Sequence, residues 1–538
     1  MSVDQALPSV AKRRWTRPPQ PRLLSYVQDK GATAPRWRRR LAWAMLIVWA
    51  FFYGMLFAFL PPAFIPPLSV PLLLLAMLVV WALPTKDWVP LRTVRGLFLS
   101  VVTALIIWPN YLAVDLPGLP WITLTRLFIF PLTAIFVVSM SVSPTVREQL
   151  KEVIAANRTT VRLLLIFVVI MFISIGFSRS PVDSFEKFVI DQFYWTAMFF
   201  IACFLFRSPS LTTRWCGLLV ALAVCVSLIA MWEWRLGRLP WVGHIPSFLH
   251  VADDSVMRSL AGQRRPGSSV LRLQSTFGES LGLAEYLALT SPLLMHFAVK
   301  ARKLWLRLLA MMLIPFIFFT IMMTGARLGM MGFLVALILY TGAWALRRWK
   351  TDRQSILAPA TLLAYPAFAG LLVAATFLSH RLHAMVWGTG NTQSSTDARI
   401  AQFHMGWPKV FQAPLGHGVA QSGDALGYAN AQGVVTIDTY TLLLALDYGP
   451  LGLIVFYSFF ATAIVPGAKI GLQSRNAESA LLLPLSISLI VFLVVKTVYS
   501  SEATHAVPFM MMGAMCALIA RHRADVADRG RPSKVLPS

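Results

Sequence analysis

The chain of 538 residues is too apolar for an ordinary soluble protein, with 57% hydrophobic residues, only 13% charged residues and a mean hydropathy of +0.65. A soluble protein of this size cannot hide so much apolar surface, whereas a chain that faces lipid has no need to. The net charge of +25 would suggest a nucleic-acid partner, but ten lysines and arginines lie in the first 40 residues and five more follow residue 520. No recognisable nucleic-acid-binding module accompanies them, so this placement indicates membrane topology and excludes nucleic acid as the expected partner.

Apolar segments long enough to span a bilayer recur along the whole chain. They predict an all-α polytopic membrane protein with about 14 transmembrane helices. We divide the chain into a basic N-terminal segment (1–40), a transmembrane domain (41–520) and a basic tail (521–538). The first apolar segment is expected to be an uncleaved anchor. The expected spans are 41–60, 66–84, 96–113, 121–141, 161–178, 187–206, 214–232, 282–299, 303–323, 328–346, 357–377, 437–465, 478–497 and 503–520.

The connections between these spans differ in charge on the two sides of the membrane. Alternate loops are rich in lysine and arginine, whereas the opposite short loops at 61–67, 114–120 and 501–505 contain neither. The positive-inside rule therefore places both termini in the cytoplasm. Two long connections, at about 233–281 and 378–436, fall on the other side. Long loops with aromatic residues and little low-complexity sequence are expected to contain local helices and to carry function.

Arginines on the side away from the cytoplasm oppose the topology rule, so each needs a reason. A guanidinium offers a planar bidentate fork and a permanent charge, which suits phosphate or pyrophosphate. The alternatives are snorkelling to lipid head groups for Arg327 and simple solvation for the arginines of the first long loop. The residues concerned are Arg258, Arg264, Arg265, Arg272, Arg327 and Arg399.

Acidic groups on the same side are few. Asp438 is our candidate general base, with a helix N-cap or an arginine partner as the alternatives. Asp447 lies nine residues further along, so the two carboxylates face differently on a helix and form no pair. Arg126 lies within an apolar segment, where a structural ion pair is the expected role. Neither the histidines of the second long loop, His380, His383, His404 and His417, nor the four cysteines have metal-site spacing, so we assign no metal and no cofactor.

Four segments, taken in order, resemble the O-antigen ligase/polymerase superfamily of Wzy-type glycan polymerases and their relatives. Arg272-Leu-Gln-Ser-Thr-Phe resembles its Arg-x-x-Ser-Thr-Phe approach to a central helix, and Thr324-Gly-Ala-Arg-Leu-Gly is similar to its Thr-x-Ser-Arg-Gly turn. Residues 399–418, with Arg399, Gly406-Trp407 and Pro414-Leu-Gly-His-Gly418, are similar to its large outer loop. Residues 438–452 are similar to its His-Asn-x-Tyr-Leu…Glu-x-Gly-x-x-Gly segment, but ligases have a histidine at the position of Asp438, and an acidic residue there fits the polymerase branch better.

This resemblance covers roughly residues 260–465 and implies a glycosyltransferase-C-like enzyme with two long periplasmic loops in a bacterial inner membrane. It implies metal-independent, inverting transfer from a polyprenyl-pyrophosphate-linked oligosaccharide to a growing polysaccharide chain. Asp438, Arg327 and Arg399 would be catalytic, and Arg264, Arg265 and Arg272 would join the two arginines in binding pyrophosphate. Membrane lipid and a chain-length regulator are the other expected partners. The alternatives are an O-antigen ligase acting on lipid A-core or protein, a lipid-linked oligosaccharide flippase, and a structural membrane scaffold.

Overall fold

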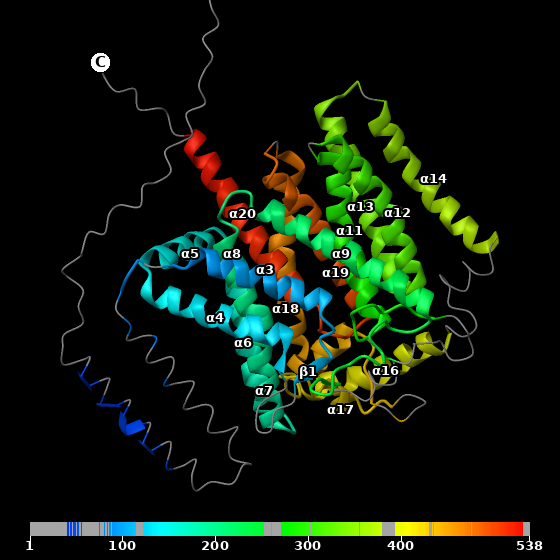
Figure 1. Ribbon diagram of the computed structural model, residues 1–538. Helices are drawn as coiled ribbons and strands as arrows, with labels where there is room; N and C mark the ends of the chain where they lie inside the picture. The colour runs from blue at the N-terminus through cyan, green and yellow to red at the C-terminus, as the bar shows by residue number, and fades with distance from the viewer. Residues whose placement is uncertain are drawn as a thin grey trace, which may run out of the picture. The chain divides into compact units, whose positions relative to one another are not determined.

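In a computed structural model of the chain, the described residues are 85–87, 89–114, 122–251, 271–301, 303–354, 356–378, 393–429, 435–474 and 476–530, with isolated positions elsewhere. The chain forms two compact units, Met1–Lys86 and Asp87–Ser538. Every helix and strand named below lies in the second unit (Figure 1).

The second unit is a helical bundle with a small β-sheet at one end. Its helices are α3 (Leu91–Ile107), α4 (Leu124–Val142), α5 (Pro144–Ala156), α6 (Arg158–Ile175), α7 (Pro181–Asp191), η2 (Gln192–Ala197), α8 (Met198–Leu205), α9 (Leu211–Leu236), α11 (Ser280–Lys300), α12 (Leu304–Met323), α13 (Arg327–Thr351), α14 (Leu357–Leu378), α16 (Gln393–Gln412), α17 (Ser422–Leu426), α18 (Tyr440–Gln473), η4 (Ser479–Leu481), α19 (Leu482–Lys496) and α20 (Ala506–Gly530). Its strands are β1 (Leu112–Val114), β2 (Ile122–Thr123) and β3 (His250–Val251).

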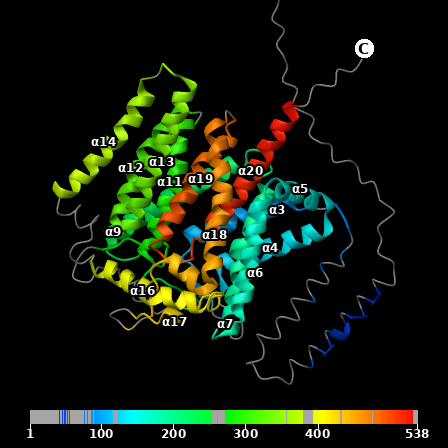
Figure 2. The same cartoon turned by 180° about the vertical axis from the view of Figure 1, so that it is seen from behind.

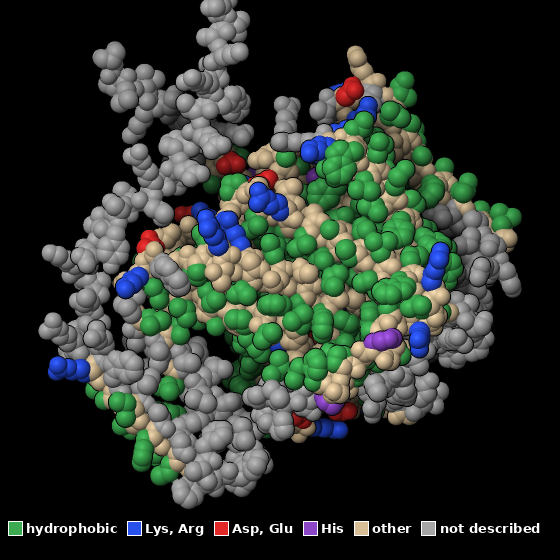
Figure 3. All heavy atoms as spheres, viewed as in Figure 1, with side chains coloured by type: hydrophobic (Ala, Val, Ile, Leu, Met, Phe, Trp, Pro, Cys, Tyr) green, Lys and Arg blue, Asp and Glu red, His purple; other side chains and the backbone are tan. Residues whose placement is uncertain are grey.

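The bundle is that of a multi-pass membrane protein. Among the described residues, nine helical segments are long and apolar enough to cross a membrane. On the face drawn in Figure 3, hydrophobic side chains cover the middle of the bundle. Each of the last twelve predicted spans coincides with a described helix or with consecutive helical segments. The spans predicted at 41–60 and 66–84 lie largely outside the described residues, so the total of fourteen stays a prediction.

Helix α11 is the centre of the bundle, packed against α9, α12, α13 and α19. In the most apolar 18-residue stretch of α11, 89% of the residues are buried inside the bundle, against 22% in that of α12. Small residues allow this packing: a Cβ added at Gly329 or Gly332 of α13 would lie 2.6 Å or 3.0 Å from the methyl groups of Ala284 and Ala288. Small residues at such positions let transmembrane helices approach closely.

One end of the bundle, which we call the site end, is where α11, α13, α18 and α20 begin and α12 and α19 end. Helices α16 and α17 lie across this end, at the bottom in Figure 1 and again in the rear view of Figure 2. They confirm the local helices expected in the second long connection. In the described part of the first, β3 instead completes a sheet of order β2-β1-β3, with Ala113 paired to Thr123 and His250. The sequence analysis did not anticipate this sheet.

Helix α18 begins later than the predicted span at 437–465. It starts at Tyr440 with Thr439 as its N-cap residue, so Asp438 lies in the extended segment before it. The alternative of Asp438 as the N-cap is therefore wrong. The helix is also kinked, because Gly449 has a φ of 71° and a non-helical backbone.

Candidate functional site

The segment that leads into α11 is held by a buried carboxylate that the sequence analysis missed. Glu233, in the last turn of α9, is only 1% exposed and accepts the backbone N–H groups of Gln274 and Ser275 at 3.1 Å and 2.8 Å. Ser275 adopts a left-handed φ of 53°, and its hydroxyl donates to the carbonyl of Val226 at 2.8 Å. Thr276 donates to the carbonyl of Ile106 at 2.6 Å. The segment 272–277 is thereby fixed between α9 and α3.

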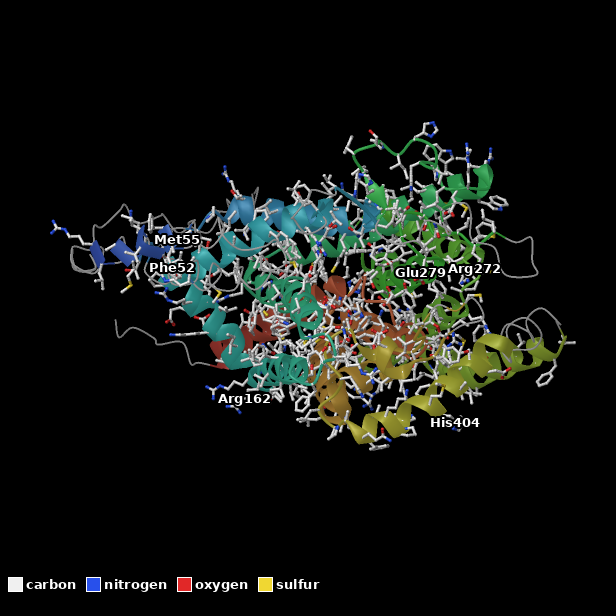
Figure 4. All side chains as sticks on the ribbon, turned by 90° about the horizontal axis from the view of Figure 1, so that it is seen from below. Phe52, Met55, Arg162, Arg272, Glu279 and His404 are labelled. Carbon is white, nitrogen blue, oxygen red and sulfur yellow. The ribbon has the colours of Figure 1, made fainter. Side chains whose placement is uncertain are left out.

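Arg272 and Arg327 flank one tight turn at the site end. The Nε of Arg272 donates to the carbonyl of Thr324 at 3.2 Å. Gly325 has a φ of 63°, and a Cβ there would lie 3.6 Å from the Arg272 side chain. Arg327 follows two residues later as the first residue of α13. Figure 4 labels Arg272 and Glu279 in the view onto the site end.

Arg399 and Asp438 form a second group at the site end. The backbone N–H of Asp438 donates to Oε1 of Gln402, a fully buried side chain of α16, at 2.9 Å. Burial raises the pKa of the Asp438 carboxyl, while the positive charge of Arg399 acts in the opposite direction. A carboxylate near an arginine is favoured in its charged form, so burial outweighs the arginine here. The charge of Arg399 thus acts on Asp438, although no ion pair joins these two described residues.

The connection between α19 and α20 joins the two groups. The hydroxyl of Ser500 donates to the carbonyl of Ile437, next to Asp438, at 2.6 Å. One residue earlier, the hydroxyl of Tyr499 lies 3.2 Å from the position of a Cβ added at Gly282 in the first turn of α11. Residues 499–500 thus touch both the start of α11 and the segment before α18. The two groups of arginines lie at the same end of the bundle.

Two sets of ion pairs, one partly exposed and one fully buried, lie at this end. Lys187 pairs with Asp191 at 2.9 Å and with Glu502 at 2.8 Å. Lys496 pairs with Glu285 at 3.0 Å, and both side chains are 1% exposed. These ion pairs could have been anticipated from charged residues within apolar segments, because such residues are costly in a membrane and seldom lack a partner. Arg126 was predicted on this ground to have a partner; it lies in the first turn of α4 and interacts with Tyr194.

Asp447 is a structural residue, well separated in role from Asp438. Its carboxylate is buried and accepts the backbone N–H groups of Ala420 and Gln421 at 3.1 Å and 3.0 Å. A Cβ at Gly449 would lie 1.9 Å from the carbonyl oxygen of Pro414, and a Cβ at Gly416 2.1 Å from that of Asp447. The Pro414–Gly418 loop and the kink of α18 therefore fit together through glycines.

Of the remaining candidate residues, two histidines are described by the structure and the others are not. His404 lies on the exposed side of α16, and Nδ1 of His417 faces the carbonyl of Leu446 at 3.0 Å. Among the described residues, no three His, Cys, Asp or Glu side chains are grouped closely enough to hold a metal ion. Arg258, Arg264, Arg265, His380 and His383 lie outside the described residues.

Residues 310–457 match the family model described as O-antigen ligase. This segment belongs to the O-antigen ligase/polymerase superfamily. The resemblance drawn from the four sequence motifs is thus confirmed, although the match begins after Arg272. The similarity of this segment to the family supports, broadly, a glycosyltransferase-like activity in polysaccharide biosynthesis, with lipid-linked saccharides as the general class of substrate. No curated protein matches the chain in sequence.

Proposed function

We propose that the protein is a polymerase that joins polyprenyl-pyrophosphate-linked oligosaccharide repeat units at the periplasmic face of a bacterial inner membrane. The observation that carries this proposal is that two groups of charged residues lie at the site end. Arg272 and Arg327 flank one turn, and the charge of Arg399 acts on the partly buried Asp438. The charge distribution of the loops supports the periplasmic side for this end. Growing polysaccharide, membrane lipid and a chain-length regulator would be its partners.

The proposed reaction needs one proton acceptor and a stabiliser for the leaving group. The acceptor hydroxyl oxygen attacks the anomeric carbon, the bond from that carbon to the pyrophosphate oxygen breaks, and pyrophosphate keeps the bonding electrons. Arg272, Arg327 and Arg399 would stabilise the charge that develops on it, since fixed donors in a water-poor site act strongly on such charge. Asp438 would take the proton of the acceptor hydroxyl, and the product would have inverted configuration.

The choice of polymerase over ligase rests on Asp438. Ligases of this superfamily have a histidine at that position, as the resemblance implies, whereas this chain has a partly buried aspartate whose pKa is raised by burial. A carboxylate with a raised pKa is a stronger base than an ordinary aspartate, which suits removal of a hydroxyl proton. An O-antigen ligase acting on lipid A-core or protein is the second candidate.

The test uses the purified protein in lipid nanodiscs with a polyprenyl-pyrophosphate-linked oligosaccharide. We expect release of polyprenyl pyrophosphate together with glycans of two or more repeat units. Arg327→Ala and Arg399→Ala should each lower the rate by about 100-fold, the usual effect of removing one group that stabilises developing charge. Arg162→Ala is the matched control, because Arg162 is an exposed arginine near the start of α6, at the opposite end of the bundle (Figure 4).

Three outcomes would contradict the proposal. Wild-type rates in folded Arg327→Ala and Arg399→Ala variants would remove the arginines from the reaction. Release of polyprenyl pyrophosphate only when lipid A-core or an acceptor protein is added would identify a ligase. Movement of the lipid-linked saccharide between leaflets without any release would identify a flippase.

A further inference from the structure

Gln402 presents an unused hydrogen-bond donor beside Asp438. The side chain is fully buried, and its Oε1 accepts the backbone N–H of Asp438 at 2.9 Å. That contact fixes the orientation of the amide, because only the oxygen can accept. The other amide atom, Nε2, is therefore a donor. Among the described residues it has no hydrogen-bond partner.

Arg399 adds a second donor of the same kind. It precedes Gln402 by three residues on α16, a spacing that places two side chains on the same face of a helix. Its Nε is also buried, and it too has no partner within the part of the chain that the structure describes. Buried donors without partners are rare and costly in folded proteins, so two neighbouring ones call for a shared explanation.

A purely structural role explains only one of the two polar atoms of the Gln402 amide. Fixing the segment before α18 requires an acceptor for the N–H of Asp438, and Oε1 supplies it. The Nε2 group contributes nothing to that contact, so a residue with an acceptor alone would serve as well. Other buried polar groups near the site end also lack partners among the described residues: the amide of Gln274, the hydroxyls of Ser280 and Thr439, and the ring of His505, which is enclosed by aromatic rings. Gln402 differs from them because its amide also bonds the backbone N–H of the proposed base.

We propose that Gln402 Nε2 and Arg399 Nε bind oxygens of the acceptor saccharide and hold its attacking hydroxyl against Asp438. A sugar carries several adjacent hydroxyls, so one can accept from the two donors while its neighbour gives its proton to the carboxylate. The site end then has two parts, with Arg272 and Arg327 at the leaving group and Gln402 and Asp438 at the acceptor. Arg399 serves both, with its Nε at the acceptor saccharide and its charge stabilising the leaving group. The inference rests on the proposed function, because it assigns the acceptor side of the same site.

Two replacements separate the two atoms of the amide. Gln402→Glu keeps an acceptor for the N–H of Asp438 but has no donor when ionised. Gln402→Met has a side chain of similar length that offers neither the amide acceptor nor the amide donor. Gln412→Glu is the matched control, since it makes the same change at an exposed position at the end of the same helix. The rate of polyprenyl pyrophosphate release is measured against the concentration of added lipid-free repeat unit and, separately, of lipid-linked donor.

We expect both Gln402 variants to raise the acceptor KM at least about tenfold, which corresponds to about 1.4 kcal/mol of acceptor binding. Their donor KM should stay within about twofold of wild type, and Gln412→Glu should change neither constant. An unchanged acceptor KM in either variant would overturn the inference. So would an equal rise in both KM values, or failure of both variants to fold, because each result would assign Gln402 to structure alone.

Calorimetric binding of the lipid-free repeat unit, without donor, separates this inference from the proposed function. If wild-type protein releases no polyprenyl pyrophosphate but binds the repeat unit in a Gln402-dependent manner, the saccharide site stands and the polymerase proposal falls. If the protein turns over normally and the Gln402 variants bind the repeat unit as wild type does, the polymerase proposal stands and the saccharide site falls. Absence of binding by the wild type would also overturn the site.

Discussion

Burial and Arg399 act on the Asp438 carboxyl in opposite directions, and burial prevails, so its pKa lies above the ordinary value. Only the ionised carboxylate accepts a proton, so the proposed activity is lost as pH falls through this raised pKa. Arg399→Gln removes the charge that opposes burial, so we expect the acidic limb of the kcat/KM profile to move to higher pH. Arg399→Lys keeps the charge and should leave the limb close to the wild-type position.

The pH profile has a control in Asp438→Asn, which cannot ionise. This variant should lose most of its activity, and any residual rate should show no acidic limb from this group. An Arg399→Gln limb at the wild-type pH or below it would exclude Asp438 as the base whose ionisation limits the rate.

At the level of single residues, the sequence suggests some members of the proposed site better than others. Arg272, Arg327, Arg399 and Asp438 could be proposed because loop charge indicates the side of the membrane on which each lies. Gln402 cannot be found in this way. Its role depends on a contact with a residue 36 positions away, and a lone glutamine in a polar helix carries no pattern.

The kink in α18 depends on Gly449 in the helix and Gly416 in the loop that packs against it, and no other residue fits either position without strain. We expect Gly449→Ala to lower the free energy of unfolding by about 2 kcal/mol or more. Alanine is strained at a φ of 71°, and its Cβ would lie 1.9 Å from the carbonyl oxygen of Pro414. Thermal unfolding of the detergent-solubilised protein measures the change. Gly370→Ala in α14 is the control: nothing lies within 4 Å of its added Cβ, and alanine there should be neutral or stabilising.

Equal effects of Gly449→Ala and Gly370→Ala would contradict the fit between the Pro414–Gly418 loop and the kink. Sequence periodicity could predict α18 as an apolar helix, because its hydrophobic residues continue on both sides of Gly449. It could not predict that the helix begins at Tyr440 or that it bends. Gln402 of α16 holds the segment before the start, and the loop after α16 packs against the bend. Helix existence was therefore predictable, and local geometry was not.

For the molecule as a whole, composition and loop charge suffice to predict a multi-pass helical protein, because a bilayer accepts few other structures. They do not predict which helices touch. Helices α11 and α19 are packed together and joined by Glu285 and Lys496, which lie 211 residues apart in the sequence. Hydropathy treats both residues only as interruptions of an apolar segment.

This buried pair leads to a test of how the site end is held together. We expect Lys496→Met to lower the free energy of unfolding by about 3–5 kcal/mol, because it leaves the Glu285 carboxylate buried without its cation. The double variant Glu285→Gln/Lys496→Met should lose less than Lys496→Met alone, since no buried charge remains unpaired. Lys151→Met is the control: Lys151 pairs with Glu148 at the surface, where the side chains are 70% and 66% exposed, and should change stability by less than about 1 kcal/mol. If the double variant is as unstable as the sum of its single replacements, the two residues stabilise α11 and α19 independently and the pair does not join the two helices.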